Sequence, residues 1–311
     1  MELTYHVVDV FTSTPLEGNS LAVFPDATGV DAATMQRIAR ELSLSETTFI
    51  LPEESNDRGT RVRIFTPAFE MEFAGHPTIG TAFVMRRLGI VARESRRFIL
   101  QENVGEVSVR VDDGENPILW LTTPPIEKLG EYSREQCATM LGIPEDRLAA
   151  RIPCELLSAG NPSIFVAVDS PATVDQARVD TAIFDRLVKD RSTPTCVFVF
   201  APTEAGAYSR MFAHQLGISE DPATGSVTGP LAFFMMKHGL VSRDDGTHFV
   251  SEQGTKMGRP SLLHVNVHGP MGANGIEVGG HVAEVATAVM RLRPLPSLAE
   301  ALPSSTLGLL S

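Results

Sequence analysis

The chain has 311 residues, of which 43% are apolar and 21% are charged, a composition typical of globular proteins. Its length allows one large domain or two domains of ordinary size. Lys and Arg number 26 against 38 Asp and Glu, so the formal net charge is −12. A charge of this sign gives no electrostatic basis for binding nucleic acid or an anionic membrane, and we expect neither as a partner.

The beginning of the chain lacks the basic residues and the long apolar run of a signal peptide. No segment approaches the roughly 18 apolar residues of a membrane-spanning helix, so we expect a cytoplasmic protein. The cysteines are Cys137, Cys154 and Cys196, an odd number without metal-binding spacing. We therefore predict buried thiols, with no disulfide framework and no metal site.

The first part of the chain alternates between strand-like and helix-like patterns. A helix is predicted over residues 33–42, where apolar residues recur at helical spacing after Asp31, a good capping residue. A second, strongly apolar helix is predicted over 78–88, ending at Gly89. The predicted strands cover residues 5–10, 21–24, 47–51, 61–65, 107–111 and 118–122.

The sequence after Pro124-Pro125, a pair that breaks helices and central strands, repeats features of the first part. Gly18-Asn19-Ser20 is echoed by Gly160-Asn161-Pro162, in each case before an apolar run. His76-Pro77-x-x-Gly80-Thr81 is echoed at nearly the same distance by Asp221-Pro222-x-x-Gly225-Ser226. The agreement in order and spacing predicts two similar halves of strands and helices, with a ligand-binding cleft between them.

The two helix starts of this repeat are candidate anion sites. Proline suits the first helical position, which would place His76 and Asp221 at the caps. The segments that follow are apolar on nearly all faces, so both helices are expected to be buried, with a kink or break at Pro230 in the second. Two buried helix N-termini with free N–H groups, facing one cleft, would bind a carboxylate.

Two interpretations are open for each titratable residue of this region. Asp221 fits a helix cap as well as a catalytic acid, because aspartate is a common cap. Glu46 fits a solvated turn, but it enters an apolar strand, where desolvation would raise its pKa towards the range useful for proton transfer. Arg259, in a glycine-containing loop, fits a substrate-anion contact or, more simply, a surface turn.

Taken together, these segments resemble the phenazine-biosynthesis PhzF-like isomerase family, within the diaminopimelate-epimerase-like fold. The resemblance runs over most of the chain and leaves only the tail after about residue 291 without a counterpart. The strings that carry it are Asp9-Val10-Phe11, Gly18-Asn19-Ser20-Leu21-Ala22-Val23, Glu41-Leu42-Ser43-Leu44-Ser45-Glu46-Thr47-Thr48-Phe49, Phe65-Thr66-Pro67, Glu72-Phe73-Ala74-Gly75-His76-Pro77-Thr78-Ile79-Gly80-Thr81-Ala82, Glu220-Asp221-Pro222-Ala223-Thr224-Gly225-Ser226 and the stretch from Gln253-Gly254 to Arg259-Pro260-Ser261.

The resemblance implies an α+β fold of two similar halves, each a curved, mostly antiparallel sheet or barrel wrapped around a central helix. We place the N-terminal half at 1–123, the C-terminal half at 124–290, and a tail at 291–311 that could pack back on the first half. The family also implies a homodimer and an active site between the halves. Racemases of this fold use a cysteine from each half, and no cysteine of this chain lies at the two helix starts.

For the site, the resemblance implies Glu46 as the acid/base, with His76 and Asp221 completing a proton relay, and no metal or organic cofactor. The further residues that we assign to substrate binding are Asn19, Ser45, Gly75, Thr78, Gly80, Gly225 and Ser226. The predicted function is a cofactor-free isomerase that moves a proton between carbons of a small carboxylate substrate, cyclic or unsaturated. The alternative is a non-catalytic member that binds a small molecule or a protein. A hydrolase is disfavoured because no nucleophile–base pair is evident.

Overall fold

The computed structural model describes residues 1–56 and 58–292. The predicted tail lies almost entirely outside the described residues. The strands are β1 (Glu2–Val10), β2 (Asn19–Phe24), β3 (Glu46–Asn56), β4 (Gly59–Phe65), β5 (Glu70–Met71), β6 (Arg97–Glu102), β7 (Gly105–Val111), β8 (Leu119–Thr122), β9 (Glu127–Tyr132), β10 (Cys154–Ser158), β11 (Ser163–Ala167), β12 (Cys196–Thr203), β13 (Gly206–Ala213), β14 (Ile218–Asp221), β15 (His248–Gln253), β16 (Ser261–Val267), β17 (Ile276–Gly280) and β18 (Val282–Arg291). The helices are α1 (Ala32–Leu42), α2 (Gly75–Leu88), α3 (Arg134–Leu141), α4 (Pro171–Gln176), α5 (Thr181–Leu187) and α6 (Gly225–Lys237), with short 3-10 turns η1 (Glu145–Arg147), η2 (His214–Leu216), η3 (Thr255–Met257) and η4 (Pro270–Gly272).

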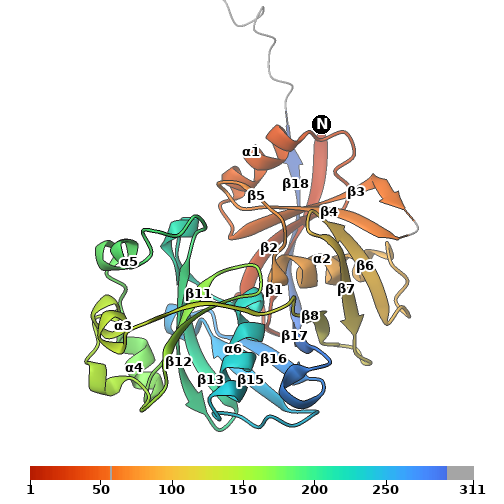
Figure 1. The fold of residues 1–311 in the computed structure, drawn as a ribbon. Helices are drawn as coiled ribbons and strands as arrows, with labels where there is room; N and C mark the ends of the chain where they lie inside the picture. Colours follow the sequence, from red (N-terminus) through yellow and green to blue (C-terminus); the bar gives the residue numbers. More distant parts are fainter. Residues whose placement is uncertain (57, 293–311) are drawn as a thin grey trace, which may run out of the picture.

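The molecule consists of two lobes, each with one central helix inside a curved sheet (Figure 1). In the N-terminal half, α2 packs against β1, β2, β3, β8 and β18, and in the C-terminal half α6 packs against β10, β16 and β17. Both helices are nearly all buried, as their apolar sequences predicted. The predicted α+β fold with two similar halves is confirmed.

The same order of strands occurs twice. In the first half β2 pairs in parallel with β3, and β4 in parallel with β6, while the other pairs are antiparallel. In the second half β11 pairs in parallel with β12, and β13 in parallel with β15. In the first half, helix α2 lies between the short strand β5 and strand β6. In the second half, helix α6 lies between the short strand β14 and strand β15, so the two helices occupy equivalent places.

The halves are joined through their sheets. Strand β8 pairs with β7 of its own half and with β17 of the other, which makes one continuous sheet. Strand β18, near the end of the described chain, returns to pair with β1 over residues 282–291. The predicted division at residue 123 stays a prediction, to which this topology adds that the strand of residues 282–291 completes the sheet of the N-terminal half.

The outer helices differ from the two central ones. Helix α1 covers the N-terminal sheet through Met35, Ile38 and Ala39, and its predicted cap is confirmed, since Asp31 accepts from the N–H of Thr34 at 2.7 Å. Helices α3, α4 and α5 lie on the outer side of the C-terminal sheet (Figure 1). Each of these four outer helices begins with a serine or aspartate that caps it.

The predicted break at Pro230 is wrong, because α6 runs without interruption from Gly225 to Lys237. The proline removes one helical N–H, but its neighbours are buried on all sides, and this packing holds the helix together. Next to it, Gly229 lies so close to Thr123 that a Cβ atom would overlap the threonine side chain. The close contact explains why a glycine precedes the proline.

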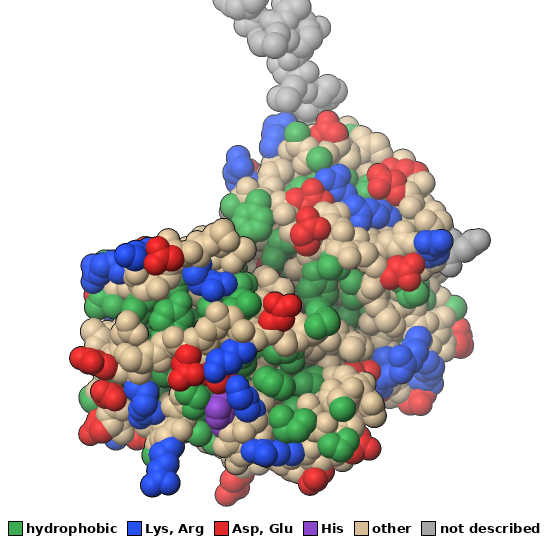
Figure 2. Space-filling view, in the orientation of Figure 1, with side chains coloured by type: hydrophobic (Ala, Val, Ile, Leu, Met, Phe, Trp, Pro, Cys, Tyr) green, Lys and Arg blue, Asp and Glu red, His purple; other side chains and the backbone are tan. Residues whose placement is uncertain are grey.

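Side chains of both charges are interspersed over the two lobes on the face shown in Figure 2. Among the helices of the described part of the chain, none combines the length and the apolar character needed to span a bilayer.

Candidate active site

The central helices of the two halves meet at their first residues. Gly75 begins α2 and Gly225 begins α6. A Cβ atom on Gly75 would lie 3.1 Å from the amide nitrogen of Ser226, and one on Gly225 would lie 3.0 Å from the ring of Phe11. A larger residue at Gly75 would press on the backbone of the other helix start, and one at Gly225 would press on the Phe11 side chain, so glycine at position 75 allows the two helix starts to approach.

The predicted caps of these helices are wrong. Helix α2 begins one residue before His76, with Ala74 as its cap, and α6 begins four residues after Asp221, with Thr224 as its cap. Neither cap residue offers a side-chain hydrogen bond. Pro77 is tolerated at the third helical position because the first four N–H groups of a helix have no partner within it. Unlike the outer helices, both central helices thus have N-termini without a side-chain cap.

Glu46 and His76 lie next to each other at this junction. Glu46 is the first residue of β3 and pairs in register with Leu21 of β2, while His76 is in the first turn of α2. Both are buried, at 8% and 5% exposure. His76 Nε2 is 3.1 Å from Glu46 Oε2, but the two atoms are not aligned as a hydrogen bond, and neither has another partner among the described residues. Two buried polar atoms therefore remain free for a ligand.

Asp221 enters the same site from the C-terminal half. It ends β14, and its carboxylate accepts hydrogen bonds from Asn19 at 2.9 Å and from Thr224 at 2.5 Å. Burial raises the pKa of Asp221 to about 6, and the negative charge of Glu46 is the second cause of this increase. The cap interpretation of Asp221 is thereby excluded, since its side chain bonds to a loop of the other half and to Thr224 but to no free N–H of α6.

Asn19 connects the two halves of the site. Its amide nitrogen lies 2.9 Å from Asp221 Oδ1, 3.0 Å from the carbonyl of Ala223 and 3.3 Å from His76 Nδ1. An amide has two protons, so these three acceptors compete, and the longest contact, to His76, is the weakest. When Asn19 does donate to His76 Nδ1, the remaining ring proton is on Nε2, which faces Glu46.

A cavity of about 40 Å³ lies between these groups. It brings together six of the predicted site residues, namely Glu46, Gly75, His76, Asp221, Gly225 and Ser226. Its remaining wall is mostly apolar and comes from Met71, Ala74, Met211, Ala213, Leu216 and Ile218. No lysine or arginine is among the lining residues, so a bound anion would depend on backbone N–H groups.

The sequence analysis missed four residues of this site. Cys196 lines the cavity, and Asn161 donates to the hydroxyl of Ser226 at 2.9 Å. Gln253 donates to the carbonyl of Asp221 at 2.7 Å and to the hydroxyl of Thr224 at 3.0 Å. The repeat itself could have indicated Asn161, which echoes Asn19. The contacts of Cys196, Thr224 and Gln253 depend on the fold and have no local signal.

Four predicted substrate-binding residues do not line the cavity: Asn19, which bonds to Asp221, and Ser45, Thr78 and Gly80, whose role stays a prediction that no contact supports. Thr78 is buried and bonds to Glu102, whereas Gly80 packs against Leu21. Ser45 lines an adjoining groove of about 650 Å³ between the halves. This groove shares Leu216 and Ile218 with the cavity and therefore adjoins it.

Neither interpretation of Arg259 included the contacts that it makes in the structure. Its guanidinium contacts Asp9 at 2.7 Å and the carbonyl oxygens of Glu17 and Gly18 at 2.7 Å each. It thus holds the loop that leads to Asn19, from a segment of the other half that also carries Gln253. In the structure, Arg259 of the C-terminal half binds the N-terminal half through these hydrogen bonds.

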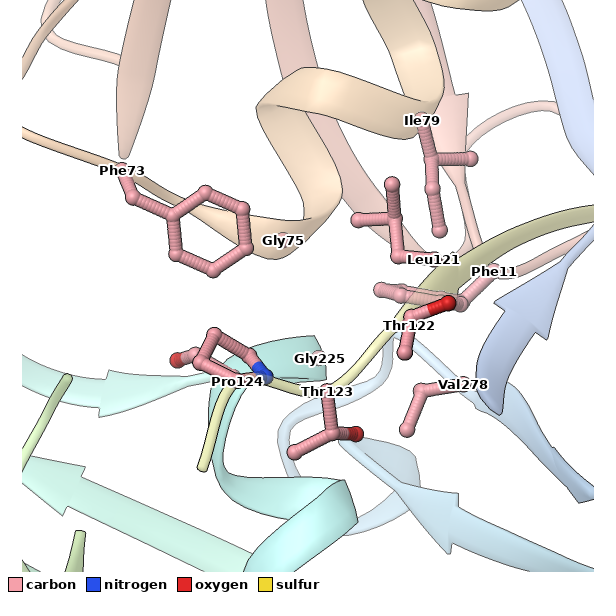
Figure 3. Close-up of a pocket in the computed structure, with 11 residues that line it drawn as sticks. Phe11, Phe73, Gly75, Ile79, Leu121, Thr122, Thr123, Pro124, Gly225 and Val278 are labelled. Atoms are coloured by element: carbon pink, nitrogen blue, oxygen red, sulfur yellow. The ribbon is translucent and has the colours of Figure 1, made fainter. Parts of the chain in front are cut away.

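A second, smaller pocket lies on the other side of the helix junction. Figure 3 shows its lining, with Phe73 and Ile79 above the gap and Pro124, Thr123 and Val278 below it. Gly75, Gly225 and Ser226 line this pocket as well as the cavity. None of its lining residues has a titratable side chain, so the chemistry of the molecule is assigned to the cavity that holds Glu46, His76 and Asp221.

The fold has two similar halves, and the cavity at their junction brings Glu46, His76 and Asp221 together. Residues 8–288 match the model of the phenazine biosynthesis-like protein family, PhzC-PhzF. The chain belongs to this family. The trans-2,3-dihydro-3-hydroxyanthranilate isomerase of Pseudomonas chlororaphis is 33% identical over 268 residues, covering 85% of this chain and 90% of the relative.

Two solved structures have the same fold. A predicted epimerase from Pseudomonas aeruginosa is 31% identical, with a TM-score of 0.78 over 94% of this chain and 100% of that one. A PhzF-family phenazine biosynthesis protein from Bacillus anthracis has a TM-score of 0.83 over the same shares, at 23% identity, which shows the fold alone. With these relatives, the predicted family and the predicted class, an isomerase, are confirmed.

Proposed function

We propose that this isomerase moves a proton between carbons of a small, unsaturated cyclic carboxylate, with Glu46 as the acid/base and without a cofactor. The observation that carries the proposal is the pair of free polar atoms, Glu46 Oε2 and His76 Nε2, buried in one cavity beside two uncapped helix starts. The named relatives act on trans-2,3-dihydro-3-hydroxyanthranilate, and we take this compound as the first substrate to test.

In this mechanism, the substrate carboxylate is held by the free N–H groups of the helix starts. Negative Asp221 and Glu46 oppose an anion next to them, so the first turn of α2 and the amides of Gly225 and Ser226 are the favoured contacts. Asp221, whose pKa is about 6, is mostly ionised at neutral pH and accepts a hydrogen bond from a substrate amine or hydroxyl.

Glu46 then removes a proton from one carbon, and the same carboxyl returns it to another carbon of the conjugated system. One base is sufficient for this reaction, because the proton leaves and returns on one face of the substrate. His76 donates a hydrogen bond through Nε2 to Glu46 or to the substrate, and this bond stabilises the negative charge of the group that accepts it. The small volume of the closed cavity excludes a ring, so the substrate enters through the groove beside Leu216 and Ile218 when the halves move apart.

The test is solvent-deuterium incorporation into trans-2,3-dihydro-3-hydroxyanthranilate. The wild-type protein is expected to convert the substrate with label exchange, and Glu46→Gln is expected to lower both rates by at least about 100-fold while remaining folded. Glu53→Gln, on the exposed part of the same strand β3, is the matched control and keeps full activity. Retained exchange in folded Glu46→Gln would refute the acid/base role.

A non-catalytic binding protein is the competing hypothesis. It predicts that the wild-type protein binds this compound or a related cyclic carboxylate with no turnover, and that Glu46→Gln leaves the affinity unchanged. Calorimetric titration beside the exchange assay separates the two hypotheses, because only the isomerase shows label in the recovered ligand.

A further inference from the structure

The segment that carries the first helix start is held from behind by the turn between β6 and β7. Glu102, at the end of β6, contacts the hydroxyl of Thr78 at 2.5 Å. Asn103 donates to the carbonyl of Met71, and the N–H of Val104 donates to the carbonyl of Glu72 at 3.0 Å. Three consecutive residues thus bind the chain on both sides of Ala74, immediately outside the cavity.

The contact between Glu102 and Thr78 can be made by either of two donors, the hydroxyl or a protonated carboxyl. The hydroxyl of Thr78 lies 2.7 Å from the carbonyl oxygen of Ala74 and 2.5 Å from Glu102 Oε1. It has one proton, and a carbonyl can only accept. When Thr78 donates to Ala74, the proton in its other contact must come from Glu102, which is then a neutral carboxylic acid.

The surroundings of Glu102 favour this neutral form. Its side chain is buried at 4% exposure, and Oε2 has no partner among the described residues. Burial raises its pKa to about 8, against the weaker effects of Thr78 and of Arg61 on β4. Arg61 is itself bound to the carbonyl of Gln101 and to Asn103. On the segment that the turn holds, Glu70 is paired with Arg63, and Glu72 and His76 are the other titratable groups.

The duplicated half offers an independent comparison. Strands β6 and β15 are equivalent, since β6 pairs in parallel with β4 and β15 in parallel with β13. Glu102 ends β6, and Gln253 ends β15. Gln253 donates through its amide to the hydroxyl of Thr224, the cap residue of α6. The residue that ends this strand thus contacts the helix start in each half, Gln253 at the cap residue Thr224 and Glu102 at Thr78, three residues after the first residue of α2.

We propose that Glu102 is a positioning residue of this active site, acting as a neutral acid that donates to Thr78 and thereby fixes Ala74, Gly75 and His76 at the start of α2. The catalytic consequence rests on the proposed function, because it assigns His76 a place in the reaction. The structural part does not depend on any substrate and is tested separately.

The protonation is tested by infrared spectroscopy of the intact protein at pH 6. The difference between wild type and Glu102→Gln is expected to contain the carbonyl band of a protonated, buried carboxyl, which disappears as the pH rises through about 8. Glu106→Gln, on the neighbouring exposed position of β7, is the control and is expected to show no such band. A carboxylate signal for Glu102 at pH 6 would overturn the proposal.

The positioning is tested by amide hydrogen exchange of residues 75–78 and by the pH profile of kcat. Glu102→Gln keeps a neutral donor, so we expect its amide protection to equal that of the wild-type protein and its kcat to lie within about threefold of the wild-type value. Above pH 8, we expect the wild-type protein to lose protection and kcat and Glu102→Gln to keep both. Glu102→Leu and Thr78→Val break the connection and are expected to raise exchange at least tenfold and to lower kcat more than they change KM. If either folds and leaves exchange at 75–78 unchanged, the proposal fails.

The two readouts distinguish the proposals. If the exchange results hold but no variant, wild type included, converts the substrate, the proposed function fails and the structural role of Glu102 stands. If Glu102→Leu does not fold, the amide protection of the other two proteins above pH 8 tests the proposal. An equal loss of protection above pH 8 in the wild-type protein and in Glu102→Gln would refute it.

Discussion

The starts of α2 and α6 occupy equivalent places in the two halves, yet their side chains differ in chemistry. Glu46 begins β3 and Cys196 begins β12, each as the first residue of the strand that runs parallel to its neighbour. His76 is the second residue of α2, and Ser226 is the second residue of α6. The carboxyl of Glu46 and the imidazole of His76 in the N-terminal half thus correspond to a thiol and a hydroxyl in the C-terminal half.

The second half contributes a carboxylate from another position. Asp221 lies four residues before the start of α6, where the first half has Met71 before α2. The duplication has kept the backbone arrangement that leaves two helix starts free, while the titratable groups have diverged. A site with a base on one side favours removal and return of a proton on one face, whereas inversion of a stereocentre by two bases needs groups on both.

Replacing His76 is expected to give the largest effect among the changes that test this comparison. His76→Gln keeps hydrogen-bonding capacity but lacks the ring Nε2 that faces Glu46, so kcat on trans-2,3-dihydro-3-hydroxyanthranilate should fall by about 100-fold or more. His6→Gln, which removes a histidine on the outer part of β1, serves as the control. Activity of His76→Gln near the wild-type level would mean that Glu46 works without its neighbour.

The carboxylate of the other half is tested through pH. The raised pKa of Asp221 means that the folded protein holds this proton between about pH 4 and pH 6, where the unfolded chain releases it. The free energy of unfolding should therefore decrease as the pH rises through this window, by up to about 3 kcal/mol. Asp221→Asn should reduce this decrease and leave the part that comes from Glu102, whose raised pKa of about 8 acts in the same direction, as measured by urea unfolding at pH 4 and pH 6.5. An unchanged slope would show that Asp221 does not titrate in this range.

The sequence predicted those features that depend on local patterns. The apolar period of α1, its Asp31 cap and the stop at Gly89 each depend on a few neighbouring residues, and all are present. The starts of α2 and α6 were misplaced because an uncapped helix gives no local signal of its beginning. For the same reason the echo of His76-Pro77 in Asp221-Pro222 is out of register by five residues with the helices, which align at Gly75 and Gly225.

The features that escaped prediction depend on contacts between distant parts of the chain. Asn19 reaches Asp221 across the junction, and Arg259 clasps the loop before Asn19, although each residue looks like an ordinary turn residue in the sequence. The pairing of β18 with β1 likewise joins the two ends of the described chain. The internal repeat had placed His76 and Asp221 at one cleft, but only the resemblance to a family added Glu46 to them, since no spacing rule connects it to either residue. The predicted homodimer and carboxylate partner stay predictions.

The close approach of the helix starts is tested by Gly75→Ala. The added methyl group meets backbone atoms of Gly225 and Ser226 at 3.1–3.2 Å, which cannot move aside as a flexible side chain could. The strain should exceed the gain in helix propensity and lower the free energy of unfolding by about 1–2 kcal/mol, with a loss of activity as the cavity widens. Gly130→Ala, where no atom lies within 4 Å, is the control for both measurements. Equal free energies of unfolding for the two variants would show that the helix junction accommodates a methyl group without strain.

The smallest effect is expected from Cys196→Ala, which replaces the counterpart of Glu46. Burial raises the pKa of this thiol to about 12, and the charge of Asp221 is the second cause of this increase. The thiol therefore stays protonated at neutral pH and cannot act as a base. We expect a loss of about 1 kcal/mol in stability from the small cavity and a change in deuterium exchange below about threefold. Loss of exchange in folded Cys196→Ala would make the site two-sided, and inversion of a stereocentre would then become the reaction to test on this protein.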